Sequence, residues 1–170
     1  MKALGLVWGN FDSTSSDLEE IRTRIDAPTQ HGAQLLVDHW RVCVANGGFV
    51  VGRDVPSRPI ASVLRCLALY EPIEGTAGFR VRLAGTAFMR RFGKDITGLN
   101  LSEIYAPPSL AVQHGNLTQV IASNEPFIWN VSAAGDGRQF LRYEAVRLPV
   151  LSPDRKERWV MGGLFYSDWT

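Results

Sequence analysis

The sequence predicts an α+β domain built on an antiparallel sheet. A half-buried strand that ends at Gly85 runs directly into a short helix, and the last fifty residues have the pattern of a three-strand meander. In that strand Phe79, Val81 and Leu83 alternate with two arginines, which is the two-residue period of a strand with one buried face. The predicted element order is β, β, short helices, helix, β, β, β, with the first two strands in a hairpin and the last three in the meander.

Composition and charge fit one ordinary globular domain. The chain has 170 residues, 45% hydrophobic and 21% charged, enough to bury a core. A formal net charge of +1 gives no field that would attract nucleic acid or an anionic membrane, and neither is expected as a partner. The Arg90–Arg91 pair is too short for a basic patch, and we expect it on a solvated helix face.

The N-terminus and the cysteines indicate where the protein works. No long apolar run precedes Asp12, so we expect neither a signal peptide nor a membrane span, and a cytoplasmic location follows. Cys43 and Cys66 have no CxxC partner and no histidine at metal-ligand spacing, so we expect buried thiols and no metal site.

Residues 1–33 are predicted to form a helical extension. Ser16 and Glu19 make a capping-box pattern that would open a helix through about Ile25. A second helix is expected over residues 33–46. Its apolar residues spread around most of the circumference, so one stripe can cover the sheet and another can meet a second copy of the chain.

The middle of the chain predicts a hairpin followed by short helices. Residues 66–70 form the first strand, and the glycines between 75 and 78 turn it back into the strand described above. Phe88 and Phe92 then lie one helical turn apart, and Gly93 follows where a left-handed residue ends the helix.

The last third of the chain predicts a helix and three strands. Pro107 and Pro108 start a helix that runs to about Ser123, and its inward stripe is Leu110, His114, Leu117 and Ile121. The strands cover about residues 127–132, 140–151 and 159–166, with a turn at Asp136–Gly137. Both faces of the final strand are apolar, so both faces of the sheet need cover.

Five sequence motifs resemble a known family. They are L-L-x-x-x-W (Leu35 to Trp40), P-S-R (Pro56 to Arg58), F-R-V-R-L-A-G-T (Phe79 to Thr86), F-G-K-D-I-T-G (Phe92 to Gly98) and R-Y-E (Arg142 to Glu144). The order and spacing are similar to those of PAS domains, in particular the single-domain PAS proteins of alphaproteobacteria, over about residues 34–166. The resemblance implies a PAS domain at 34–170 whose five-stranded antiparallel sheet carries short helices on one face, with the N-terminal helices on the other face or on a dimer partner.

That arrangement predicts a pocket between the sheet and the short helices. The residues expected to line it are mostly apolar with a few polar tips, which suits a small apolar ligand. They are Phe88, Phe92, Tyr105, His114, Leu117, Trp129, Tyr143 and Met161. A filled core of the same residues is the alternative, because protein interiors are densely packed.

Two cofactors are considered for this pocket. In haem-binding relatives of the fold the iron ligand is a histidine on the long helix, and His114 occupies that helix here. A lone histidine on an apolar face more often satisfies a local hydrogen bond, so haem is not expected. Flavin is not expected either, since neither cysteine falls on the short helices.

The resulting interpretation is a stand-alone sensory and interaction module. No helix-turn-helix, kinase or cyclase pattern fits in the remaining residues, so we expect output by contact with an unknown signalling protein and with a second copy of the chain. The dimer interface is expected at Leu36, Trp40 and Val44. Two alternatives are a ligand-free scaffold and an isomerase-like pocket enzyme, the latter using Asp95, Glu103 or Tyr143.

Overall fold

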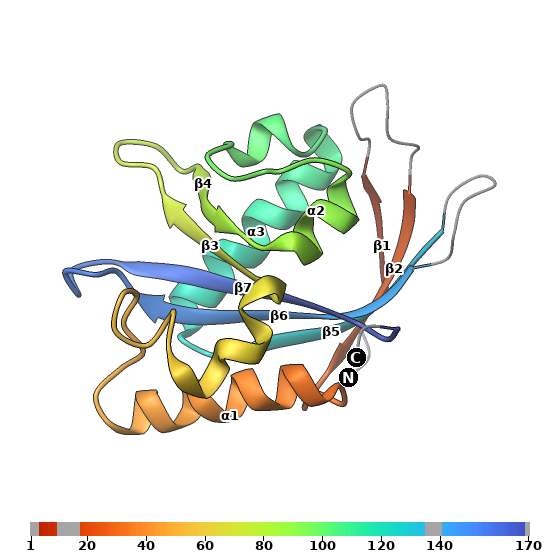
Figure 1. Ribbon diagram of the computed structural model, residues 1–170. Coiled ribbons are helices and arrows are strands. Elements are labelled where there is room, and N and C mark those ends of the chain that lie inside the picture. The colour runs from red at the N-terminus through yellow and green to blue at the C-terminus, as the bar shows by residue number, and fades with distance from the viewer. Residues whose placement is uncertain (1–3, 10–17, 135–140, 169–170) are drawn as a thin grey trace.

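The computed structural model describes residues 4–9, 18–134 and 141–168, and it contains seven strands and five helical segments (Figure 1). The strands are β1 (Leu4–Gly9), β2 (Leu18–Ile25), β3 (Leu67–Pro72), β4 (Phe79–Ala84), β5 (Phe127–Ala134), β6 (Leu141–Leu151) and β7 (Arg158–Tyr166). The α-helices are α1 (His31–Ala45), α2 (Thr86–Phe92) and α3 (Pro107–Ser123), and the 3₁₀ segments are η1 (Arg58–Cys66) and η2 (Leu101–Glu103).

All strands join one antiparallel sheet in the order β1-β2-β5-β6-β7-β3-β4. The five strands predicted from the sequence are its β5-β6-β7-β3-β4 part. In Figure 1, α2 and α3 lie over one face of this sheet, while α1 and η1 lie along the other. The predicted α+β architecture is therefore confirmed, with two additional strands at one edge.

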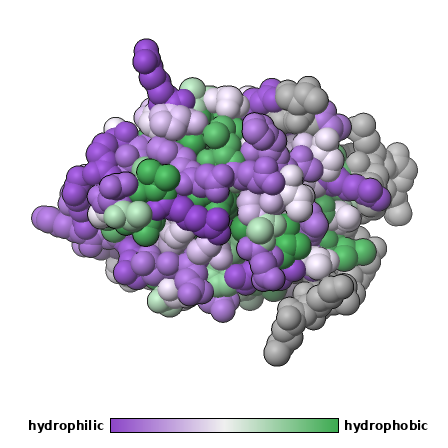
Figure 2. Space-filling model, turned by 90° about the horizontal axis from the view of Figure 1, so that it is seen from below, coloured by the Kyte–Doolittle hydropathy of each residue, from purple (hydrophilic) through white to green (hydrophobic). Residues whose placement is uncertain are grey.

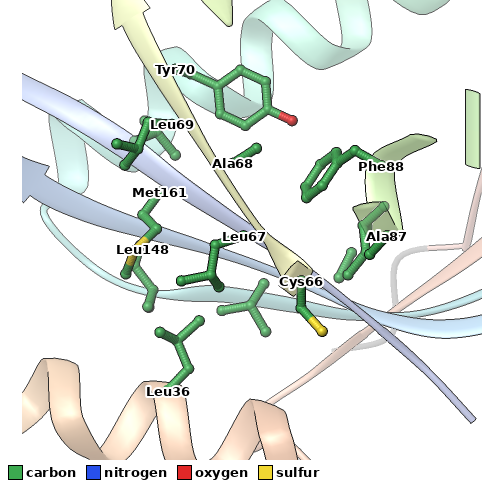
Figure 3. Packing of buried hydrophobic residues seen from close by; sticks show 14 of the residues in the cluster. Leu36, Cys66, Leu67, Ala68, Leu69, Tyr70, Ala87, Phe88, Leu148 and Met161 are labelled. Carbon is green, nitrogen blue, oxygen red and sulfur yellow. The ribbon is translucent and has the colours of Figure 1, made fainter. Parts of the chain in front are cut away.

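The register of the sheet separates two halves of the core. Leu69, Met161 and Leu148 form one row across β3, β7 and β6, and Leu36 of α1 approaches the same side. Tyr70 and Phe88 lie on the opposite side, toward α2 and α3 (Figure 3). Because side chains alternate along a strand, Met161 belongs to the α1 half of the core. Its predicted place beside Phe88 in a pocket under α2 and α3 is wrong.

Helix α1 confirms the second predicted helix but presents a different face outward. Leu36 and Trp40 are 0% and 6% exposed, and the Trp40 Nε1–H donates to the Pro149 carbonyl at 2.8 Å. These two residues are committed to the core of their own chain, so their predicted place in a dimer interface is wrong. Val44 is 42% exposed and Val42 59%, but residues two positions apart point to different sides of a helix, so they are separate exposed apolar residues and not one strip.

The N-terminal extension is a β-hairpin instead of a helix. β2 pairs with β1 on one side and with β5 on the other, so residues 18–25 belong to the sheet. The helix predicted through Ile25 is wrong over these residues, and Ser16, its expected cap, lies outside the described residues. A capping box is a local signal, and the backbone bonds that β5 offers along the length of β2 outweigh it.

The remaining elements follow the sequence closely. Gly93 ends α2 with φ 74°, the left-handed conformation that glycine adopts at least cost. Pro107 and Pro108 occupy the first positions of α3, and β6 and β7 extend to Leu151 and Tyr166 as predicted. The predicted Asp136–Gly137 turn lies outside the described residues. Within the described ranges, no helix is long and apolar enough to cross a membrane.

Candidate functional site

The space between the sheet and helices α2 and α3 contains a buried ionic group centred on Glu20. This carboxylate, 5% exposed, forms an ion pair with Arg91 of α2, whose Nη2 and Nε both donate to Oε1. The Tyr143 hydroxyl of β6 donates to the same oxygen at 3.0 Å and accepts from the Arg91 Nε at 3.1 Å. Three elements distant in the sequence therefore meet at one carboxylate.

The N-terminal hairpin also contributes a cation to this space. The Arg22 Nε lies 3.3 Å from Glu20 Oε2, and its guanidinium is 5.4 Å from the centre of the Trp129 ring. The alternation of β2 directs Glu20 and Arg22 inward and leaves Ile21 between them 48% exposed. The usual pattern of apolar inside and polar outside is inverted in this strand.

A third arginine, Arg147 of β6, lies under the middle of α3. It is 5% exposed, its Nη2 donates to Gln113 Oε1 at 3.2 Å, and its guanidinium lies 4.5 Å from the centre of the Tyr70 ring. Gly162 of β7 makes room for this stack. A Cβ on Gly162 would come 2.9 Å from Tyr70 Cε2 and 3.2 Å from Arg147 Nη1.

Electrostatics keep these groups charged. Burial alone would raise the pKa of Glu20, but Arg91 and Arg22 together with their hydrogen bonds outweigh burial and lower it to about 2. Burial would lower the pKa of Arg147, yet Tyr70 and Tyr105 outweigh it and raise it. Burial raises the pKa of Tyr143, and the negative charge of the nearby Glu20 carboxylate raises it further. The Tyr143 hydroxyl therefore stays protonated and can donate.

The predicted pocket residues divide between this interior and its margin. Phe88, Phe92, Leu117 and Tyr143 are buried in one continuous core cluster, while Tyr105 and Trp129 are partly buried against it. Tyr105 meets the Phe92 ring edge to face, with centroids 5.8 Å apart. That these residues line a pocket for a ligand stays a prediction.

His114 points away from the ionic group. Its Nε2 is hydrogen-bonded to the Ala77 carbonyl in the β3–β4 turn, and its ring meets Phe79 edge to face at 5.5 Å. The nitrogen that would bind haem iron is thus used to fasten α3 to that turn, which agrees with the local hydrogen bond expected from the sequence.

Four charged residues of the site were not predicted. Arg91 is 6% exposed, so its predicted solvated position is wrong, whereas Arg90 forms an exposed ion pair with Asp168. Glu20 and Arg22 fell in the mispredicted N-terminal helix. Arg147 did carry a signal, since it is a charged residue in a strand whose neighbours on both faces are apolar.

The residues weighed for catalysis have structural partners. Asp95 accepts from the Thr97 backbone N–H at 3.0 Å, and Glu103 accepts from the Asn100 N–H at 2.8 Å as part of a capping box. Both carboxylates therefore serve local turns, while Tyr143 serves the ionic group.

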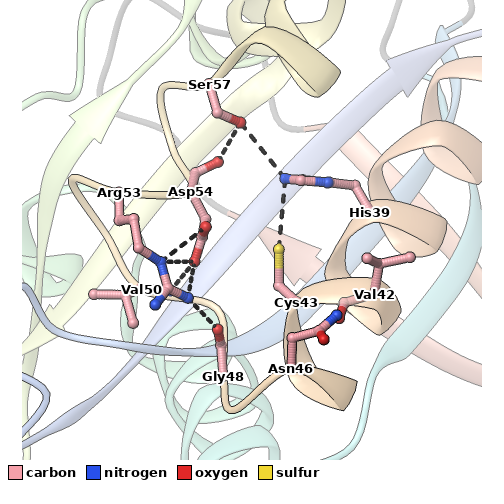
Figure 4. Close-up of polar contacts among 9 residues, drawn as sticks. All are labelled: His39, Val42, Cys43, Asn46, Gly48, Val50, Arg53, Asp54 and Ser57. Atoms are coloured by element: carbon pink, nitrogen blue, oxygen red, sulfur yellow. Dashed lines mark hydrogen bonds and ion pairs between the residues drawn. The ribbon is translucent and has the colours of Figure 1, made fainter.

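A second polar cluster lies between α1 and the 48–57 loop (Figure 4). The His39 Nε2 is 3.6 Å from Cys43 Sγ and 3.5 Å from Ser57 Oγ, and Asp54 accepts from the Val50 N–H at 2.7 Å. Burial and the Asp54 carboxylate raise the pKa of Cys43. A raised pKa keeps the thiol protonated, the opposite of an activated nucleophile, so this cluster ties the loop to the helix.

An open cleft of about 250 Å³ lies on the α1 face of the sheet, between the start of α1 and η1. His31, Val63, Cys66 and Phe165 are among the residues that line it. It is separated from the ionic group by the sheet itself, since Phe165 belongs to the α1 face of β7. This cleft and the buried charged interior therefore lie on opposite faces of the sheet.

Comparison with protein families identifies the fold. The family model described as PAS domain matches residues 30–165. The chain belongs to the PAS domain family. No curated protein and no solved structure showed significant similarity to it. The β1–β2 hairpin lies before the matched region, so Glu20 and Arg22 reach the PAS interior from outside the part that the family shares.

Proposed function

We propose that this PAS domain is a sensory module that converts a change in its charged interior into a change at the N-terminal hairpin, which a protein partner then reads. PAS domains are typically sensory and signalling modules, so the general role follows from the family. The observation that supports this specific route is the Glu20–Arg91 ion pair, because it joins the hairpin to α2 inside the interior.

Competition for the two arginines that pair with Glu20 gives a physical basis for the switch. A ligand that attracts the guanidinium of Arg91 or Arg22 removes a counter-ion of Glu20, and a buried carboxylate that loses a counter-ion is disfavoured. The hairpin that carries Glu20 then becomes less stable relative to a displaced position. A ligand shifts such an equilibrium only by its different affinity for the two states, and the ion pair supplies that difference.

Native mass spectrometry of the protein as purified tests the ligand part of the proposal. We expect a mass above that of the bare chain, and a refolded sample freed of small molecules should return to the bare mass. Hydrogen exchange tests the switch, since residues 18–25 should exchange at different rates in the two samples. Identical masses and identical exchange in both samples would contradict a sensory role and favour the ligand-free scaffold.

A homodimer through α1 is the simplest protein contact. Val42 is 59% exposed on the side of α1 opposite its buried face, and Figure 2, which views the molecule from the α1 side, shows apolar patches among polar residues on this face. Light scattering of Val42→Asp compared with Arg41→Asp, an exposed neighbour on the same helix, tests this contact. A dimer that both variants retain would exclude this surface.

A further inference from the structure

We infer that the ligand of this interior is a small oxyanion, with a carboxylate or phosphate group bound between Arg22, Arg147 and the first turn of α3. This inference rests on the proposed sensory function and names the ligand class. It starts from the balance of buried charge. Three guanidinium groups are buried on the face of the sheet that α2 and α3 cover, those of Arg22, Arg91 and Arg147.

One buried carboxylate, that of Glu20, faces these three cations. The described part of the chain has two other buried carboxylates, and both are used elsewhere. Glu71 binds Arg80, and Glu144 accepts from the Thr29 and Gln30 N–H groups before α1. Among the described residues, Arg22 and Arg91 thus share the Glu20 carboxylate, and Arg147 forms no ion pair.

Water cannot replace the missing counter-ion. A buried water molecule would accept hydrogen bonds from guanidinium N–H groups, but it carries no net charge. A guanidinium stays ionised in proteins, so the interior cannot remove the excess charge by losing a proton. An anion removes both problems, because it accepts the hydrogen bonds and neutralises the charge.

Three elements around this interior carry unused donors. Among the described residues, Arg147 Nη1, Arg22 Nη1 and Ser109 Oγ are buried and have no hydrogen-bond partner, while Arg22 Nε lies 3.3 Å from Glu20 Oε2. Arg22 is 7% exposed, Arg147 5% and Ser109 1%. Three donor atoms from β2, β6 and α3 are thus available to an acceptor inside the domain.

The path of α3 places Ser109 between the two arginines. α3 runs along β6, because Gln113 accepts from Arg147 and the Ile121 carbonyl accepts from Arg158, the β7 partner of Leu151. The buried face of α3 contains Ser109, Gln113 and Leu117, so it is shifted from the predicted stripe that included Leu110 and His114. Ser109 lies one turn before Gln113, toward Tyr143 of β6, which is aligned with Arg22 of β2 through Val131 of β5. That end of a helix also carries a partial positive charge, which favours an anion.

A ligand with one or two negative charges, such as a dicarboxylate or a phosphate monoester, suits Arg147, which has no ion pair among the described residues, and Arg22, which shares Glu20 with Arg91. A guanidinium fork binds either group through two parallel hydrogen bonds. The structure therefore favours a charged ligand over the small apolar one expected from the aromatic residues.

Three probes test the ligand class on the full chain at constant ionic strength: inorganic phosphate, succinate and its neutral analogue succinamide. We expect phosphate or succinate to raise Tm and to bind in calorimetry, and succinamide to do neither. The stronger of the two anions tells whether the natural group is a phosphate or a carboxylate. Arg147→Met and Arg22→Met should weaken the binding about tenfold or more, because each removes a charged hydrogen-bond donor. Arg82→Met, at an exposed position of β4, should leave it unchanged.

The anion-free protein gives a second, independent measurement. Without an anion, wild type and Arg147→Met should differ less in Tm than they do with saturating phosphate or succinate, because the variant lacks a donor that the anion uses. The inference is overturned if neither anion raises the Tm of wild type, or if the anions raise the Tm of Arg147→Met by as much. Hydrogen exchange of residues 18–25 during the titration separates this inference from the sensory role. Anion binding with unchanged exchange would support the ligand class and refute the switch. A neutral compound retained by the purified protein, together with no binding of either anion, would refute the ligand class and leave the sensory role in place.

Discussion

Replacing Glu20 with glutamine should destabilise the protein at neutral pH and much less in acid. The pKa of Glu20 falls from 4.5 to about 2 on folding, a difference of about 2.5 units, and each unit corresponds to about 1.4 kcal/mol. The ionised carboxylate therefore contributes on the order of 3 kcal/mol to the free energy of unfolding. Loss of one partner from a buried pair costs about 3–5 kcal/mol, which agrees with this figure.

The direction of the pH dependence follows from the lowered pKa. Stability from Glu20 is fully present above its unfolded pKa of 4.5 and is lost as the pH falls from there toward about 2. Urea unfolding at pH 7, 5, 4 and 3 should show wild type and Glu20→Gln converging as the pH drops. Glu71→Gln is the matched control, because its partner Arg80 is half exposed and such pairs contribute at most about 1 kcal/mol. A Glu20→Gln variant within 1 kcal/mol of wild type at pH 7, or a gap that stays constant to pH 3, would refute this reasoning.

Three further predictions concern packing and reactivity. Gly162→Ala should lower the unfolding free energy by about 1–3 kcal/mol because its Cβ would meet the Tyr70 ring at 2.9 Å, whereas Gly115→Ala, with nothing within 4 Å, should stabilise α3 by about 0.5–1 kcal/mol in the same urea assay. Leu36→Ala should cost about 2–5 kcal/mol, measured by thermal unfolding, because Leu36 is 0% exposed in the core; a loss below 1 kcal/mol would mean that α1 is loosely attached. Cys66 should react with a thiol reagent at pH 7 more slowly than free cysteine, since it is buried and burial raises its pKa, and a faster reaction would contradict this environment.

Sequence patterns predicted the elements whose local and tertiary preferences agree. The alternation over residues 79–82 and the glycine at position 93 each favour one backbone conformation, and the fold uses both, although Leu83 at the end of β4 is 50% exposed. The N-terminal hairpin failed because its pattern is inverted: Glu20 and Arg22 face inward while Ile21 faces solvent. Rules that place charges outside cannot recognise such a strand.

The charged site was missed for a related reason. A buried arginine is recognised only through its partners, and those partners come from β2, α2, α3 and β6, which are brought together by the fold and not by the sequence spacing. Arg91 looks the same in the sequence as its neighbour Arg90, although one is 6% exposed and the other binds Asp168 at the surface. Aromatic and apolar spacing thus indicated the interior but not its charge.

The β1–β2 hairpin also determines where this domain can be shortened. A chain trimmed to the boundary shared with the family, at residue 30, would keep all five common strands. It would nevertheless uncover the backbone N–H and C=O groups of β5 that β2 now pairs, and such a bare edge invites association with other chains. The same cut would separate Arg91 from the Glu20 carboxylate. Residues upstream of the homologous region are therefore part of the folding unit.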